Sequence, residues 1–98
     1  MLQILKTWPE PFQAVVEGRK AYEIRVNDRN FKVGDFLCLL EWDPEDMTYT
    51  GREVEATVTY MTPGGKWGIP ENLCVMGIQV KSVWSGVQGP HVPEEGTP

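Results

Sequence analysis

The sequence predicts one small α+β domain: a curved sheet or pseudo-barrel of five to six mostly antiparallel strands with one N-terminal helix. Three observations support this fold class. The 98 residues suit a single domain with a single core. Eight prolines and ten glycines divide the chain into short segments. Several of those segments alternate apolar with polar residues, which is the period of a strand with one buried face.

The N-terminal residues predict a strand followed by a helix. Leu2–Lys6 has the composition of a short strand, and Thr7 is the expected N-cap of the helix. Pro9 suits a first helical turn, because the N–H that proline lacks has no partner there. The helix is expected over about residues 9–17, with its stop at Gly18. Its apolar stripe consists of Phe12, Val15 and Val16.

Four further strands are expected at 21–26, 36–42, 52–61 and 73–80, the last continuing toward Trp84. The strand at 36–42 has little polar content, so we expect it to be central and buried on both faces. The strand at 52–61 is expected to place Tyr60 on one face with Val54, Ala56 and Val58, and the glutamates on the other. Between these two strands, Asp43–Gly51 reads as an acidic hairpin loop.

The domain is expected to comprise residues 1–85, followed by a flexible tail at 86–98 that has no apolar period. Cys38 and Cys74 lie in apolar runs, so we expect two buried free thiols in a reducing cytoplasm. The single histidine, His91, falls in the predicted tail. No metal-ligand cluster, secretion signal or membrane-spanning run is present, so no metal, cofactor or membrane contact is expected.

The charge distribution predicts a local basic site on an acidic molecule. A formal net charge of −5 disfavours strong non-specific binding to nucleic acid. Residues 19–32, however, carry five cations against two anions, and residues 33–61 carry seven anions against one cation. Such a site can hold one selected phosphate or base but cannot follow a long backbone.

The informative stretch is Gly18–Arg29, GRKAYEIRVNDR. Period two places Glu23, Arg25 and Asn27 on one strand face, with Tyr22, Ile24 and Val26 on the other. From charge alone, a Glu–Arg pair on a strand face is ordinarily a surface ion pair worth about 0–1 kcal/mol.

This stretch also resembles a known signature. Gly18–Arg25 is similar to the G-x-K-x-x-E-x-R pattern of ASCH domains, which belong to the PUA-like superfamily. The resemblance extends over residues 2–80 to an ASCH-related family of uncharacterised phage and bacterial proteins. Its further blocks are Leu5–Pro9, Asn27–Asp35, Glu41–Pro44, Tyr49–Arg52 and Val75–Ile78.

The resemblance implies a small β-barrel whose cleft binds RNA or a modified nucleotide. Lys20 and Arg25 suit phosphate, and Glu23 suits a base amino group. Trp8, Tyr22 and Trp42 suit base stacking, with core packing as the alternative, which the alternation with Ile24 favours for Tyr22. The full set of candidate ligand-binding residues is Lys6, Trp8, Lys20, Tyr22, Glu23, Arg25, Asn27, Arg29 and Trp42.

Two alternatives stay open. Some ASCH-like proteins are amidohydrolases that deacetylate acetylcytidine with a lysine, a threonine three residues later and a glutamate. Lys20 matches the lysine, but Glu23 occupies the threonine position, and Glu71 is the only glutamate in the loop after the long strand. If the protein is an enzyme, Lys20 and Glu23 are the candidate catalytic residues. The other alternative is a phage accessory protein that contacts a host protein through the acidic loop at 43–46.

Overall fold

The computed structural model describes residues 1–85 and has an α+β fold with one five-stranded sheet and one short helix. The predicted tail at 86–98, with His91, lies outside the described residues. In chain order the elements are β1 (Leu2–Thr7), α1 (Pro9–Val16), β2 (Tyr22–Val26), β3 (Phe36–Asp43), β4 (Thr48–Pro63) and β5 (Leu73–Ser85).

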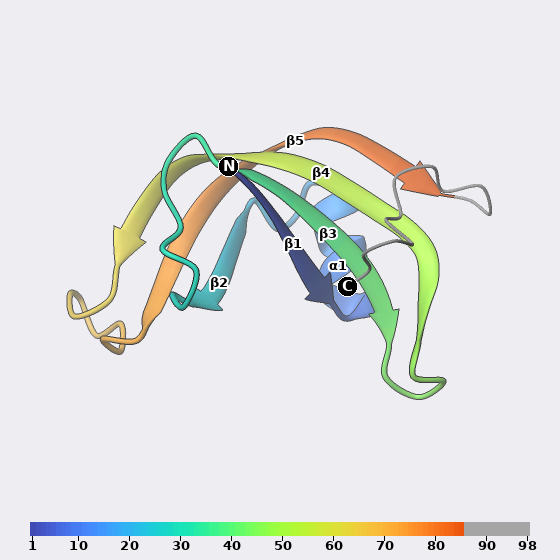
Figure 1. Ribbon diagram of the computed structural model, residues 1–98, viewed down its shortest axis with the longest axis horizontal. Coiled ribbons are helices and arrows are strands. Elements are labelled where there is room, and N and C mark those ends of the chain that lie inside the picture. The colour runs from blue at the N-terminus through green and yellow to red at the C-terminus, as the bar shows by residue number, and fades with distance from the viewer. Residues whose placement is uncertain (86–98) are drawn as a thin grey trace.

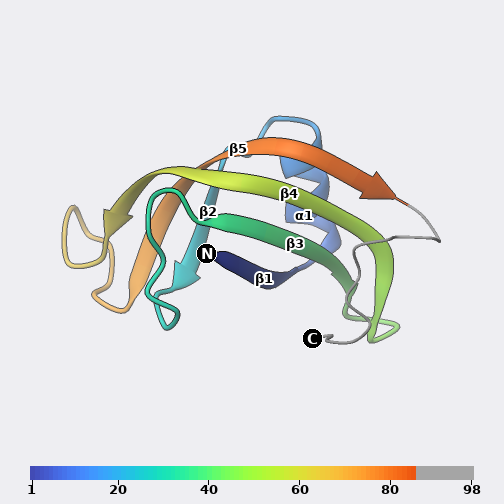
Figure 2. The same cartoon turned by 45° about the horizontal axis from the view of Figure 1, so that its top comes forward.

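The sheet is a half-barrel that curls around the helix. Its strand order is β1-β3-β4-β5-β2, in which β1 pairs with β3 in parallel and the other pairs are antiparallel. Figure 1 shows the long strands β4 and β5 arching over the molecule, with α1 beneath the arch. In Figure 2 the two edge strands, β1 and β2, lie on the concave side. The first and last strands of the sheet are therefore brought to one opening.

The core fills the space between α1 and the concave face of the sheet. Phe12 and Val15 of the predicted helical stripe are buried, and Val16 packs against them as a partly buried residue. Strand β3 has five consecutive buried residues, Leu37–Glu41, which confirms that it is buried on both faces. Leu37 and Leu39 of this run belong to the core, whose remaining members are Leu5, Phe31, Val54, Ala56, Val58, Cys74, Met76 and Ile78.

The acidic hairpin is shorter than expected. Only residues 44–47 form the turn, because β4 already begins at Thr48 and pairs across to β3. The Asp43 carboxylate accepts hydrogen bonds from the backbone N–H groups of Glu45 (2.9 Å) and Asp46 (3.4 Å). An aspartate that binds the backbone just after it stabilises a tight turn. The predicted loop at Asp43–Gly51 is therefore wrong in its second half.

Two predicted residue environments on β4 are also wrong. Tyr60 is exposed although Val54, Ala56 and Val58 are buried as expected. The register of β4 against β5 shifts between Val58 and Tyr60, and this irregularity breaks the alternation. Glu53, expected on the polar face, is buried, and its carboxylate accepts a hydrogen bond from the Cys38 thiol at 3.4 Å.

The polarity of β2 is the reverse of an ordinary amphipathic strand. The apolar residues Tyr22, Ile24 and Val26 are exposed, whereas Glu23 is only 3% exposed. The core packing favoured for Tyr22 is therefore wrong. Since β2 is an edge strand that pairs only with β5, its inner face looks across the opening toward β1 rather than into the apolar core. The strand consequently turns its charged residues inward.

Candidate functional site

Arginine side chains bridge the opening between β2 and β1. Arg25 Nη2 donates to the Lys6 carbonyl oxygen at 3.0 Å and to Thr7 Oγ1 at 3.1 Å. Arg29 Nη1 donates to the Ile4 carbonyl oxygen at 2.7 Å. Backbone acceptors on the edge strand β1 are thus satisfied by side chains instead of another strand. Thr7 takes part in this bridge and does not cap the helix; the N-cap is Trp8, without a side-chain hydrogen bond.

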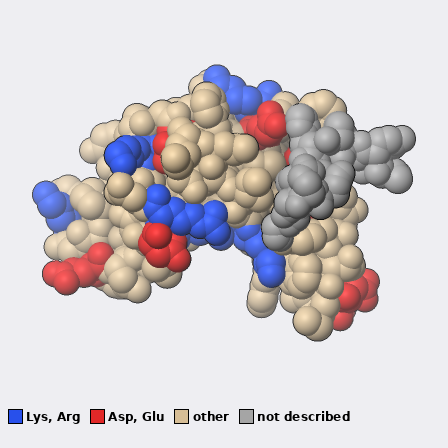
Figure 3. Space-filling view, viewed as in Figure 1, with Lys and Arg blue, Asp and Glu red and all other residues tan. Residues whose placement is uncertain are grey.

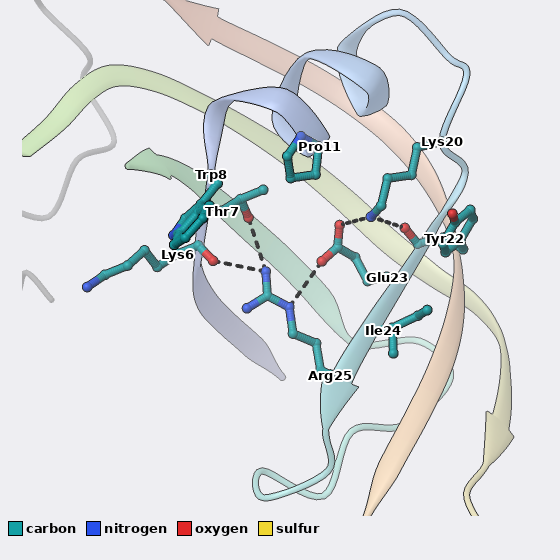
Figure 4. A pocket seen from close by; sticks show the side chains of 9 residues that line it. All are labelled: Lys6, Thr7, Trp8, Pro11, Lys20, Tyr22, Glu23, Ile24 and Arg25. Carbon is teal, nitrogen blue, oxygen red and sulfur yellow. Dashed lines mark hydrogen bonds and ion pairs between the residues drawn. The ribbon is translucent and has the colours of Figure 1, made fainter. Parts of the chain in front are cut away.

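A cavity of about 330 Å³ lies beside the Arg25 bridge. It is formed where the end of β1 and the start of α1 face β2, as Figure 4 shows. Its lining residues are Lys6, Thr7, Trp8, Pro11, Lys20, Tyr22, Glu23, Ile24 and Arg25. Six of these are among the sequence-predicted site residues, so the cavity brings Lys20, Glu23 and Arg25 together with Trp8.

The buried Glu23 carboxylate holds two cations in this cavity. Its Oε2 accepts from Lys20 Nζ at 2.8 Å, and its Oε1 accepts from Arg25 Nε at 3.1 Å. Lys20 Nζ also donates to the Tyr22 carbonyl oxygen at 2.6 Å. Both carboxylate oxygens are therefore engaged, and Glu23 acts to position Lys20 and Arg25. Each cation keeps a free donor within residues 1–85: Arg25 Nη1 has no acceptor there, and Lys20 Nζ uses two of its three N–H groups.

The walls of the cavity are apolar and accessible. Trp8 is 59% exposed. Its backbone is fixed at the start of α1, because its carbonyl oxygen accepts the first helical hydrogen bond, from Phe12 N. Tyr22 and Ile24 form the opposite wall, and the Lys20 Nζ lies 4.8 Å from the centre of the Tyr22 ring. The arrangement offers a planar ligand an aromatic surface beside cationic donors.

Three predicted residues lie elsewhere. Asn27 accepts a hydrogen bond from the backbone N–H of Phe31 at 3.1 Å, so it stabilises the turn after β2. Arg29 lines a second cavity. Trp42 packs edge-on against Tyr49, with ring centroids 4.8 Å apart, and Lys6 Nζ lies 4.1 Å above its ring. Lys20, Glu23 and Arg25 were expected to converge with either Trp8 or Trp42, and it is Trp8 that lines the cavity with them.

Sequence reasoning missed Thr7, Pro11 and Ile24 as cavity residues. Thr7 precedes Trp8, and Pro11 follows it by three residues, so nearness to Trp8 in the sequence could have indicated both as cavity residues. Their contact with β2 depends on the curl of the sheet, which no local pattern specifies. Glu71 lines neither this cavity nor the second one.

The cysteines are buried free thiols, as predicted. Burial, together with the nearby Glu53 carboxylate, raises the pKa of Cys38 to about 12. Burial also raises the pKa of Cys74. Neither thiol is activated as a nucleophile. Within residues 1–85, no group of three or more His, Cys, Asp and Glu side chains is placed to hold a metal ion.

A second polar cluster fixes the helix that forms one wall of the cavity. Arg52 on β4 donates two hydrogen bonds to Glu41 on β3, from Nε at 2.8 Å and from Nη2 at 3.1 Å. Arg52 Nη2 also donates to Gln13 Oε1 on α1 at 2.9 Å. The hydrogen bonds from Arg52 lower the pKa of the Glu41 carboxyl below its ordinary value.

In the described part of the chain, no helix has the length and apolar character needed to cross a membrane.

The chain is similar to a protein family of unknown function and to a protein of one bacteriophage. Residues 3–78 match the model of a protein family described as "Domain of unknown function (DUF3850)". A relative from Escherichia phage P2, the "Uncharacterized 12.9 kDa protein in GpA 3'region", is 45% identical over 56 residues. That alignment covers 57% of this chain and 50% of the relative, so the chain spans about half the length of the phage protein.

Proposed function

We propose that this chain, which belongs to the DUF3850 family, binds RNA or a free or modified nucleotide in the cavity between β1 and β2. One observation carries the proposal. A buried carboxylate, Glu23, holds Lys20 and Arg25 in a cavity that an exposed tryptophan, Trp8, flanks. With Lys6 also on the lining, the cavity has three cations against one carboxylate in a chain of net charge −5.

The chemistry of the cavity suits a phosphorylated base. Lys20 and the outer face of the Arg25 guanidinium supply donors for phosphate oxygens. Trp8 supplies a surface on which a base can stack, a contact worth about 1–3 kcal/mol per base. A volume of about 330 Å³ is at the lower end for ligand cavities, which favours one nucleotide unit over a larger group.

The resemblance of Gly18–Arg25 to the ASCH signature supports the same proposal. The resemblance implies that this segment lines a cleft, and the segment does line the cavity described above. We assign the half-barrel to the PUA-like superfamily on this resemblance. The phage relative adds no information on ligands, since its printed name specifies none.

The proposal is tested by titrating nucleoside monophosphates, modified nucleosides and short RNAs into the protein and into two tryptophan variants. Trp8→Ala should weaken binding by about fivefold to a hundredfold, because one stacking contact is lost. Trp67→Ala is the matched control: Trp67 is 83% exposed and does not line the cavity, so binding should be unchanged. Failure of every ligand to bind the folded protein at low salt would refute the proposal and favour a protein partner.

An amidohydrolase acting on an acylated nucleoside is the second candidate, because Lys20 and Glu23 lie 2.8 Å apart inside the cavity. In that reaction water adds to the acyl carbon, the C–N bond breaks, and a carboxylate and the free amine are released. Product formation in the same titrations would reveal it. Lys20→Arg should then abolish turnover while retaining binding, because a guanidinium cannot give up its proton near neutral pH.

A further inference from the structure

A second cavity of about 360 Å³ continues from the first along β2 toward the turn that follows it. The two cavities share Ile24 and Arg25, so they lie next to each other along the opening between β1 and β2, with the Arg25 side chain at their boundary; together they are called the groove below. The second cavity is lined by Leu5, Ile24, Arg25, Val26, Asp28, Arg29, Phe31 and Leu73. The function proposed above uses only the first cavity.

The second cavity combines apolar walls with a basic rim. The buried side chains of Leu5 and Phe31 form part of its lining, with Leu73 half-buried beside them. Arg29 is exposed, and within residues 1–85 its side chain donates only one hydrogen bond, to the Ile4 carbonyl oxygen. Arg29 forms no ion pair with the described residues. Its remaining N–H groups are therefore available to an anionic or polar ligand.

The groove as a whole is basic. Its lining contains four cations, Lys6, Lys20, Arg25 and Arg29, against two carboxylates, Glu23 and Asp28. The remainder of the chain is strongly acidic, because the net charge of the whole is −5. Figure 3 shows basic side chains between the two arms of the curled sheet, with acidic ones beside them, and further acidic side chains at the ends of both arms. This contrast concentrates attraction for an anion within the groove.

We propose that the groove holds two successive nucleotides of a single strand. One base stacks on Trp8 in the first cavity, and the next nucleoside occupies the second cavity. The connecting phosphodiester lies at Arg25, which lines both cavities and directs Nη1 away from its protein partners. This proposal rests on the proposed function and specifies its substrate class as a single-stranded dinucleotide segment.

The groove favours a single strand over a duplex. Each cavity has the volume of one nucleotide unit, and a base must leave its stack to enter it. Four cations, of which two are already paired with Glu23, cannot follow a longer backbone. The Asp28 carboxylate on the lining of the second cavity would also repel a third phosphate.

The experiment measures the affinity of the full chain for a 5′-phosphorylated mononucleotide, dinucleotide and trinucleotide of RNA by titration calorimetry. The dinucleotide should bind about tenfold more tightly than the mononucleotide, and the trinucleotide should add less than about twofold. Arg29→Gln should remove the advantage of the dinucleotide and leave mononucleotide affinity within about twofold. Arg19→Gln is the matched control, because Arg19 is exposed and lines neither cavity, and it should alter neither affinity.

A second variant keeps the test independent of the Arg29 bridge. Val26→Trp adds bulk at an exposed residue that lines only the second cavity, so it should reduce dinucleotide binding selectively. Equal affinities for mononucleotide and dinucleotide would refute the two-nucleotide groove and leave the proposed function standing. Tightening by the same factor with each added nucleotide would refute the limit of two. Absence of binding to all three ligands would refute the two-nucleotide groove, and absence of binding to the modified nucleosides as well would refute the proposed function itself.

Discussion

Replacing Arg52 with methionine is expected to destabilise the fold by about 2–3 kcal/mol. Methionine keeps much of the length of the side chain but removes every hydrogen bond that the Arg52 guanidinium donates. Three of these are lost, two to Glu41 and one to Gln13. The guanidinium also lies 4.9 Å from the centre of the Phe12 ring, so a cation–π contact disappears. The variant thereby loosens α1, whose Pro11 forms part of the cavity.

The size of the effect follows from the burial of Glu41. Its side chain is 6% exposed, so the variant leaves a buried carboxylate without its cation. Breaking a fully buried pair costs about 3–5 kcal/mol. The Arg52 side chain is 31% exposed, and water can replace part of its contribution, which lowers the figure to about 2–3 kcal/mol. For a domain of this size the melting temperature should fall by about 10–20 °C.

The effect should depend on pH. The pKa of Glu41 in the folded protein is lowered from its ordinary value of 4.5, chiefly by the hydrogen bonds from Arg52. Because the pKa is lower in the folded protein, the ionised Glu41 carboxylate stabilises the fold at pH values above its ordinary pKa. That stabilisation is lost as the pH falls through the lowered pKa. The difference in the free energy of unfolding between wild type and Arg52→Met should therefore be largest near neutral pH and should become smaller in acid.

Urea unfolding of both proteins at pH 7 and at about pH 3 measures the gap directly. Arg19→Met is the control, since Arg19 makes an exposed ion pair with Glu17 that contributes little to stability. Equal losses in the free energy of unfolding for the two variants would show that the Glu41–Arg52 pair stabilises the fold no more than an exposed ion pair does. A gap that stays constant between the two pH values would refute the assignment of the effect to the Glu41 carboxylate.

Two predictions concern the rest of the fold. Because the pKa of Cys38 is raised to about 12 and Cys74 is buried, both thiols should resist a thiol reagent at pH 8 until denaturant is added; prompt labelling of the folded protein would contradict this. Gly64→Ala should destabilise by about 1–3 kcal/mol in urea unfolding, since its Cβ would lie 2.2 Å from the Pro70 carbonyl oxygen. Gly68→Ala is the comparison, because it meets backbone strain, at φ +83°, but no steric clash; a loss for Gly64→Ala no larger than that for Gly68→Ala would count against the clash as the cause.

The local elements were predictable because their signals are local. Pro9, the stripe from Phe12 to Val16 and Gly18 specify the helix through its first turn, buried face and stop. The apolar run at 36–42 specifies a buried strand. By contrast, the start of β4 at Thr48–Gly51 has no apolar alternation, and its extended conformation comes from pairing with the end of β3. An extended conformation that arises from tertiary pairing cannot be predicted from the residues of one polar segment alone.

The candidate site was predictable only where its residues are neighbours in sequence. Lys20, Glu23 and Arg25 fall within one short segment, so charge and resemblance both indicated them. The hydrogen bond from Arg25 to Thr7 joins residues 18 apart in the chain, and it depends on how far the sheet curls. Trp42 was a candidate for the same cavity beside Trp8, but it packs against Tyr49 across the β3–β4 hairpin.

The reversed polarity of β2 is the strongest sign that this edge of the sheet serves a ligand. Burying Glu23 with two cations carries a desolvation cost, and such pairs are often no more stabilising than apolar residues of similar volume. Meanwhile Ile24, which is 52% exposed, contributes little to the core. A sequence selected for stability would place the apolar residue inside and the charge outside. A strand that departs from that rule gives up some stability and holds its charged side chains in a preformed arrangement. Such departures concentrate at functional sites. The same reasoning makes Glu23→Leu informative: if β2 serves only the fold, the substitution should be neutral or stabilising in urea unfolding, whereas the proposed function requires loss of nucleotide binding whatever the stability.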